Sequence, residues 1–422
     1  MTIKHFVFAG AAFSLAAAAT AQTLDYDRAY SAELNADAAA RTSQLQGGTA
    51  GNDGFFYISD GSGNYRLNMS GLIQFRYSLD FRDDQPTNAS GGDDDDTTIG
   101  FSVPRLKLRW HGNVINPNWK FMVQVDWDSE GTLNFEKGYG QYDFEGWEGG
   151  FVRWGQFKLP ILAEELVEPE FQLAAERTLT NEFFSQGYSQ GVMLGYRSDA
   201  FAFYGAFSDG VNSSGTNYNS AAEADYAFTG RVDVKFEGDW DRFDDFTSWR
   251  GDDLAVRVGG AIHWQSTGDT NPSLADNNEL LLYTIDAAVE GNGWNLFAAF
   301  IGNNVDMGAG SDVDHFGAVV QGGIFITDQC ELFGRWDALF LDEDTVAAGA
   351  DEDQHFLTFG TNYYVVPQSH AAKLTLDLVW ALNETSPALT TLGTLPDSRV
   401  TQLLGDSEDS EILLRGQINV AF

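Results

Sequence analysis

The sequence is poor in cysteine, in proline and in long apolar runs. Its single cysteine, Cys330, excludes an internal disulfide framework, so stability has to come from burial and strand pairing. The chain has only 9 prolines and few long helical periodicities, but it has 45 glycines and 14% aromatic residues. This composition favours a large all-β protein.

Basic residues are also scarce. There are 24 Lys and Arg against 62 Asp and Glu, which gives a formal net charge of −38. Because clusters of Lys and Arg are needed to bind nucleic-acid phosphates, the charge argues against a nucleic-acid partner. The acidic residues gather in runs at 93–96, 239–253, 342–344, 351–353 and 406–411. The first run could bind Ca²⁺ or Mg²⁺, or it could be a solvated loop.

The common catalytic and metal-binding patterns are missing. None of the six histidines has a metal-ligand spacing such as H-E-x-x-H, and no G-x-S-x-G elbow is present. A serine beside a histidine, as Ser369 is beside His370, is the one hint of a hydrolase. We therefore expect no metal, no cofactor and no enzyme activity.

The one long apolar stretch lies at the amino terminus. It runs over residues 6–19 after Lys4 and His5, and small residues at 19–21 follow it. The stretch is shorter than the roughly 20 residues that a spanning helix needs, so residues 1–21 are predicted to be a secretory signal peptide. Residues 22–54 carry Tyr30, Leu34 and Ala38 at helical spacing and then a glycine-rich end. They are predicted to be a periplasmic amphipathic helix or a linker.

Alternation of apolar and polar residues fills most of 55–422. The last twelve residues show it most clearly, because every even position from Ile412 to Phe422 is apolar or glycine. Such alternation is typical of a strand with lipid on one side and a polar lumen on the other, or of a half-buried edge strand. We predict sixteen strands, at 66–80, 98–112, 119–127, 134–144, 150–158, 189–197, 200–208, 226–237, 253–264, 279–290, 294–302, 315–326, 330–340, 354–365, 372–381 and 411–422.

The connections between these strands alternate between short and long, with the 238–252 connection as the one exception. Short turns on one rim and long loops on the other are typical of a transmembrane antiparallel β-barrel in the outer membrane. The outer surface would then contact lipid, with tryptophans at the strand ends in the headgroup region. Residues 55–422 are accordingly predicted to form the barrel.

Inward-facing positions carry charges of both signs. The predicted pore-lining residues are Arg76, Arg109, Lys120, Asp126, Arg231, Asp233, Lys235, Arg257, Asp286, Arg335, Asp337, Lys373, Asp377 and Arg415. Opposed charges across a wet channel create a transverse field, whereas strong anion selectivity would need an unopposed basic set.

One motif is more specific. Gly155, Gln156, Phe157, Lys158 and Pro160, with the Glu-Arg pair at 176–177 downstream, resemble the G-Q-F-K-x-P motif of the phosphate-selective porin O and P family. The resemblance implies a trimeric outer-membrane porin whose third long loop folds into the barrel. On that basis Arg177 is the constriction candidate, with Glu176 and Glu182 beside it. Alternatively, Glu176 and Arg177 pair to hold the loop against the wall.

The resemblance leaves the solute open. The family's phosphate-binding arginine ladder does not map residue by residue onto this chain, and acidic loops would repel anions at the mouth. Three hypotheses follow: a passive diffusion porin, a plugged or structural barrel that binds at the cell surface, and a secreted soluble β-rich glycan-binding protein. Under the first two hypotheses, the resemblance implies that Phe422 is the residue recognised by the outer-membrane assembly machinery.

Overall fold

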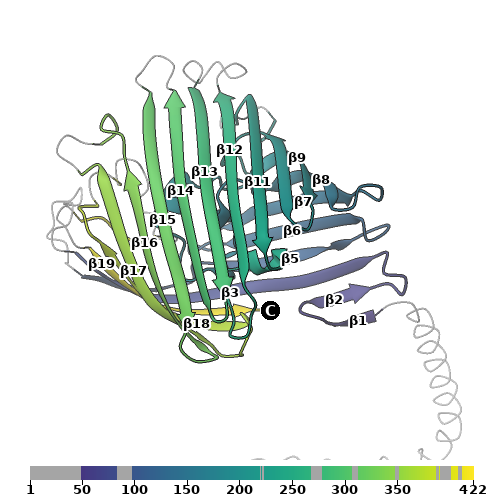
Figure 1. The fold of residues 1–422 in the computed structure, drawn as a ribbon, viewed down its shortest axis with the longest axis horizontal. Helices are drawn as coiled ribbons and strands as arrows, with labels where there is room; N and C mark the ends of the chain where they lie inside the picture. Colours follow the sequence, from purple (N-terminus) through teal and green to yellow (C-terminus); the bar gives the residue numbers. More distant parts are fainter. Residues whose placement is uncertain are drawn as a thin grey trace, which may run out of the picture.

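The chain folds as a closed antiparallel barrel of sixteen strand positions (Figure 1). The computed structural model describes residues 49–82, 97–218, 220, 223–267, 278–306, 312–346, 351–385, 389, 401–406 and 411–422. The predicted signal peptide, most of the 22–54 segment and the acidic run at 93–96 lie outside these residues. In the described part, no helix is both long and apolar enough to cross a membrane.

The barrel strands match the predicted ones closely. They are β3 (Arg66–Phe81), β4 (Thr97–Ser102), β5 (Leu106–Asn113), β6 (Trp119–Trp127), β7 (Leu133–Asp143), β8 (Gly150–Phe157), β9 (Ser189–Arg197), β10 (Phe201–Ser208), β11 (Tyr226–Glu237), β12 (Ala255–Thr267), β13 (Asn278–Gly291), β14 (Trp294–Asp306), β15 (Val313–Phe325), β16 (Cys330–Phe340), β17 (Asp353–Tyr364), β18 (Ala372–Ala381) and β19 (Ile412–Ala421). β4 and β5 share one position, because both pair with β3. Pro104 lies between them and has no N–H to donate, which accounts for the interruption of the predicted 98–112 strand.

The last strand closes the barrel on the first. β19 pairs antiparallel with β3, from Ile412 opposite Phe81 to Ala421 opposite Leu72. The Phe422 carbonyl then accepts from the Gly71 N–H at 2.7 Å, and the Phe422 N–H donates back at 3.0 Å. The prediction that the carboxy-terminal strand pairs with the first barrel strand is confirmed.

A small hairpin precedes the barrel. β1 (Thr49–Asn52) pairs with β2 (Phe56–Ser59), which pairs with the start of β3, from Phe56 opposite Met69 to Ser59 opposite Arg66. The hairpin therefore extends the edge of β3 beyond the end of β19. It was not predicted, because two four-residue strands among glycines give too little alternation to detect.

The strand faces separate as the alternation predicts. On β18, Leu374, Leu376 and Trp380 are exposed outward, whereas Lys373 and Asp377 are buried inside. Exposed aromatic and aliphatic side chains cover the outside of the other strands as well. An apolar outer face around a polar interior is the pattern of a membrane barrel.

Short and long connections lie at opposite ends of the strands, named here the short-turn rim and the long-loop rim. The structure adds a second exception to the predicted alternation, since residues 128–132 join β6 to β7 by a short turn on the long-loop rim. The 238–254 connection, on the short-turn rim, contains a 3₁₀ turn, η2 (Trp240–Phe243). The 159–188 connection contains α2 (Ala163–Leu166), η1 (Pro169–Phe171) and α3 (Leu179–Phe184).

Candidate functional site

Residues 159–188, named here the inner loop, fold into the barrel as predicted. Leu159, Ile161 and Leu173 in this loop are almost completely buried. Thr178 caps α3, because its side chain accepts the Asn181 N–H at 2.9 Å. A connection that buries its own apolar residues is an ordered element of the barrel interior.

Glu176 fastens the middle of the inner loop to the wall. Its carboxylate forms ion pairs with Arg76 of β3 and with Arg105, which lies between β4 and β5, the latter at 2.7 Å. Both arginines are buried, and Arg76 also donates to Gln417 of β19 at 2.8 Å. Burial alone would raise the pKa of Glu176, but the guanidinium groups of Arg105 and Arg76 outweigh it and lower the pKa to about 2.

Contacts with β16 to β18 fix the rest of the loop. The Ala175 N–H donates to Asp377 at 2.9 Å, and the Thr180 N–H donates to Asp337 at 3.2 Å. Lys373 donates to the carbonyls of Glu170 and Gln172, at 3.1 and 2.6 Å. The inner loop therefore fills the part of the lumen next to β16, β17 and β18.

The two predicted constriction residues do not pair with each other. Arg177 is 7% exposed, donates to the Val167 carbonyl at 2.7 Å and lies 3.3 Å from a Glu165 carboxylate oxygen. Glu176 turns instead to Arg76 and Arg105. Burial and the nearby Glu165 raise the pKa of the third candidate, Glu182, to about 8. Both members of the Glu-Arg pair thus hold the loop, although by separate partners.

The 238–254 connection, named here the rim segment, closes part of the barrel from the other end. The Phe246 N–H donates to the Phe171 carbonyl of the inner loop at 3.2 Å, and the Phe246 ring packs on Phe297 of β14 at 5.0 Å. The Trp249 ring packs edge-on against Tyr364 and tilted against His370, with ring centroids 4.7 and 5.4 Å away. The inner loop and the rim segment therefore meet inside the barrel.

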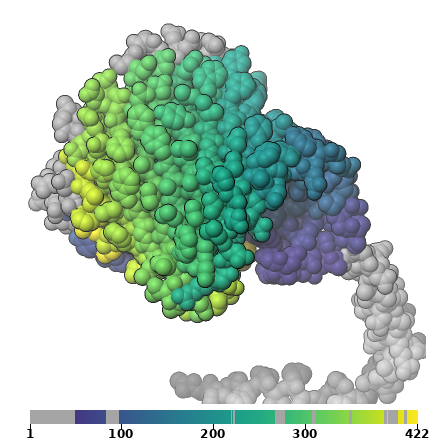
Figure 2. Space-filling view, viewed as in Figure 1, coloured from purple at the N-terminus to yellow at the C-terminus, as the bar shows by residue number. Residues whose placement is uncertain are grey.

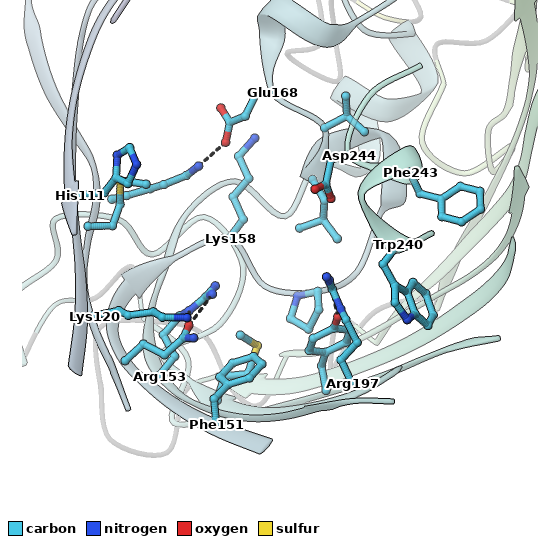
Figure 3. Close-up of a pocket in the computed structure, with 18 of the residues that line it drawn as sticks. His111, Lys120, Phe151, Arg153, Lys158, Glu168, Arg197, Trp240, Phe243 and Asp244 are labelled. Atoms are coloured by element: carbon cyan, nitrogen blue, oxygen red, sulfur yellow. Dashed lines mark hydrogen bonds and ion pairs between the residues drawn. The ribbon is translucent and has the colours of Figure 1, made fainter. Parts of the chain in front are cut away.

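A cavity of about 840 Å³ remains beside these two segments and is named here the vestibule. Its lining comes from the inner loop, the rim segment, the hairpin residue Phe55, the 144–149 turn and the inner faces of β3 and of β5 to β12. Figure 2 shows the surface hollowed between the purple amino-terminal residues and the teal strands. The side chains labelled in Figure 3 surround this space.

Basic residues outnumber acidic ones in the vestibule lining, which reverses the balance of the whole chain. The eight basic residues are Arg109, Lys120, Lys137, Arg153, Lys158, Arg197, Arg231 and Arg257, and the five acidic residues are Asp143, Glu168, Glu170, Asp233 and Asp244. Six of the eight have a carboxylate within 4.0 Å. For Arg153 and Arg197, the described residues provide no such carboxylate.

Some predicted pore-lining residues line the vestibule and others do not. Arg109, Lys120, Arg231, Asp233 and Arg257 line it. The other predicted residues have partners elsewhere. Six of them bind the inner loop or pair with each other beside it: Arg76, Arg335, Asp337, Lys373, Asp377 and Arg415. The remaining three pair with wall or turn residues: Asp286 with Arg231 and Arg257, Asp126 with Lys107, and Lys235 with Asp199. The alternation along a strand indicates which side chains face the barrel interior, but it does not indicate which of them the inner loop or an ion-pair partner covers.

Arg153, Arg197, Lys137, Glu168 and Glu170 line the vestibule without having been singled out in the sequence. A signal for Arg153 existed, since it lies within the stretch that carries the family motif and shares the strand parity of Gly155 and Phe157. No comparable signal marks the two glutamates, because a loop has no periodicity to read.

The motif residues position the start of the inner loop. Gly155 has φ +119°, and a Cβ there would lie 2.3 Å from the Gly138 carbonyl oxygen, so glycine is required. Gln156 donates to the Phe135 carbonyl at 2.7 Å, and Phe157 is buried. Lys158 pairs with Glu165, and Pro160 lines the vestibule.

Among the described residues, no three His, Cys, Asp or Glu side chains are grouped to hold a metal ion. No family model matches the chain, and no curated protein matches it by sequence.

Solved structures match the fold. The trimer form of OmpT, an outer membrane protein of Vibrio cholerae, is 13% identical with a TM-score of 0.53, over 84% of this chain and 99% of that one. The outer membrane channel DcaP of Acinetobacter baumannii is 12% identical with a TM-score of 0.53, over 84% and 96%. Salmonella typhi OmpF in complex with daunomycin is 10% identical with a TM-score of 0.56, over 86% and 99%. The chain therefore shares its barrel fold with these outer-membrane proteins.

Proposed function

We propose that this chain is an outer-membrane porin, a water-filled channel for passive diffusion of ions and small hydrophilic solutes. The observation that supports this most directly is the vestibule, a charged cavity of about 840 Å³ inside a closed barrel with an apolar outer face. An inner loop that leaves only part of the lumen open suits a channel that limits the size of its solutes.

The proposal includes the partners and the absence of catalysis. The chain assembles as a homotrimer, which is supported by the family resemblance and by the trimer form of OmpT among the similar structures. Its carboxy-terminal strand, ending at Phe422, is recognised by the outer-membrane assembly machinery. Because most of its wall charges are held in ion pairs, we assign it no catalytic residue.

The chain's departure from the phosphate-selective family is also part of the proposal. The motif at 155–160 agrees with that family, but most lumen arginines pair with carboxylates within 4.0 Å. A buried guanidinium group that is already paired offers fewer donors to a passing phosphate. We therefore propose that the chain shares the family's inner loop without its selectivity for phosphate.

A plugged barrel is the second candidate, because the inner loop and the rim segment meet at Phe171 and Phe246. Purified full-length protein in planar bilayers separates the two. A porin gives stepwise conductance and a reversal potential in a salt gradient. Repeated insertions without conductance, combined with conductance after deletion of residues 163–182, would identify a plugged barrel.

A further inference from the structure

Two arginines of the vestibule differ from its other basic residues, because only neutral groups hold them. Arg153 of β8 donates through Nε and Nη2 to Gln141 Oε1, at 3.0 and 2.8 Å. Arg197 of β9 donates through Nη2 to the Tyr204 hydroxyl at 3.1 Å. The other six basic residues of the lining each have a carboxylate within 4.0 Å.

Aromatic rings keep these two guanidinium groups in place. The Arg153 guanidinium lies 4.3 Å from the Tyr139 ring centroid, and the Arg197 guanidinium lies 5.4 Å from that of Trp240. Trp240 is itself fixed by a bond from its Nε1 to the Ser198 carbonyl at 2.7 Å. A guanidinium has five N–H donors, so each of these arginines keeps most of its donors for a ligand.

Both arginines face the same space. Phe151 and Arg153 are two residues apart on β8, and Phe151 lies opposite Gly195 of β9, two residues from Arg197. Figure 3 shows the two arginines on either side of Phe151, reaching into the cavity. Nearby, Asp143 is occupied by Lys120 at 2.5 Å and by Gln141 at 2.7 Å.

Apolar side chains form much of the remaining wall. Met122, Met193, Leu166, Trp240 and Phe243 all line the vestibule. Unpaired guanidinium forks match a carboxylate, which can accept two parallel N–H bonds. Apolar walls beside them favour a ligand that also carries an apolar body.

We propose that Arg153 and Arg197 form a binding site for small carboxylates with an apolar body, such as aromatic acids, in the vestibule. The site rests on the proposed porin function and would hold such solutes during passage. Because the chain is strongly acidic, the two arginines supply most of the electrostatic attraction that it offers to an anionic solute.

Calorimetric titration of full-length detergent-solubilised protein with benzoate tests the proposal. Benzamide removes the charge of the probe, and phosphate removes its apolar body. We expect benzoate to bind at least roughly tenfold more tightly than either, since charge-assisted hydrogen bonds and apolar burial both contribute. Equal affinity for benzoate and benzamide, or for benzoate and phosphate, would overturn the site.

Substitutions test the residues. R153Q together with R197Q should weaken benzoate binding by about tenfold or more. The matched control is R250Q, which removes one charge from the rim segment at a residue that does not line the vestibule. Arg153→Lys and Arg197→Lys keep the charge but lose the planar fork, so they should recover only part of the affinity. If the double variant binds benzoate as R250Q does, the proposal is wrong.

The titration does not depend on conduction. Conductance without benzoate binding would overturn this site and leave the porin function standing. Benzoate binding without conductance would overturn the porin function and leave the site standing. Each variant, loaded on a denaturing gel without heating, should migrate like the unheated wild type, which shows that its barrel has folded.

Discussion

Replacing Glu176 by glutamine should release the middle of the inner loop. The substitution keeps an acceptor oxygen but removes the charge that two buried arginines, Arg76 and Arg105, share. Loss of one partner from a buried ion pair costs about 3–5 kcal/mol. Arg76 retains Gln417 as a partner, so the lower value, about 3 kcal/mol, is the better estimate here. The detached loop should then become about a hundredfold more populated relative to the attached one.

Single-channel recording measures this release. We expect E176Q to show larger conductance steps and more frequent open-channel noise than the wild type. Its unheated sample should migrate on a gel like the unheated wild type, because the barrel itself stays folded. E343Q makes the same chemical change at an exposed residue on the long-loop rim and should leave the recordings unchanged. Wild-type steps and noise in E176Q would show that the ion pair does not fasten the loop, and the reasoning would fail.

Four further predictions follow from the same contacts. Because the pKa values of Glu165 and Glu176 are lowered to about 2 from 4.5, their stabilisation of the loop is complete above pH 4.5 and is lost as the pH falls toward 2, so conductance should become larger and noisier in that window. F246A should cost about 3 kcal/mol and widen the short-turn mouth, measured as faster swelling of protein-containing liposomes in larger neutral sugars. D244N removes a carboxylate from the vestibule and should strengthen benzoate binding in calorimetry, and unchanged affinity would contradict this. Current should rectify at low salt and become symmetric near 1 M, where the Debye length falls to about 3 Å.

The strands could be predicted because each carries its own signal. Alternation fixes the two faces of a strand, and turn residues fix its ends within a few positions. The failures have local causes. Pro104 splits one predicted strand, and β1 and β2 are too short to show a period.

The site was less predictable, because it depends on contacts between distant residues. Arg76 and Glu176 are 100 residues apart, and no periodicity links a wall residue to a loop residue. The inner face was also expected to be polar, yet Phe297 of β14 and Phe333 of β16 are buried inside against the inner loop and the rim segment. An inward apolar side chain is stable there because these two segments, rather than water, cover it.

These contacts explain why the excess acid of the chain does not determine the charge of its lumen. Most wall arginines, such as Arg231 beside Asp233 and Asp286, are neutralised at contact distance and contribute little field further away. The acidic runs at 342–344 and 351–353 lie on the long-loop rim, the second reaching the first residue of β17. Among the basic residues that line the vestibule, those without a carboxylate partner in the described part of the chain are Arg153 and Arg197, near the opposite rim. An anion would therefore meet repulsion at one mouth and attraction at the other, so the position of two arginines, more than the net charge of −38, should determine which solutes remain in the vestibule.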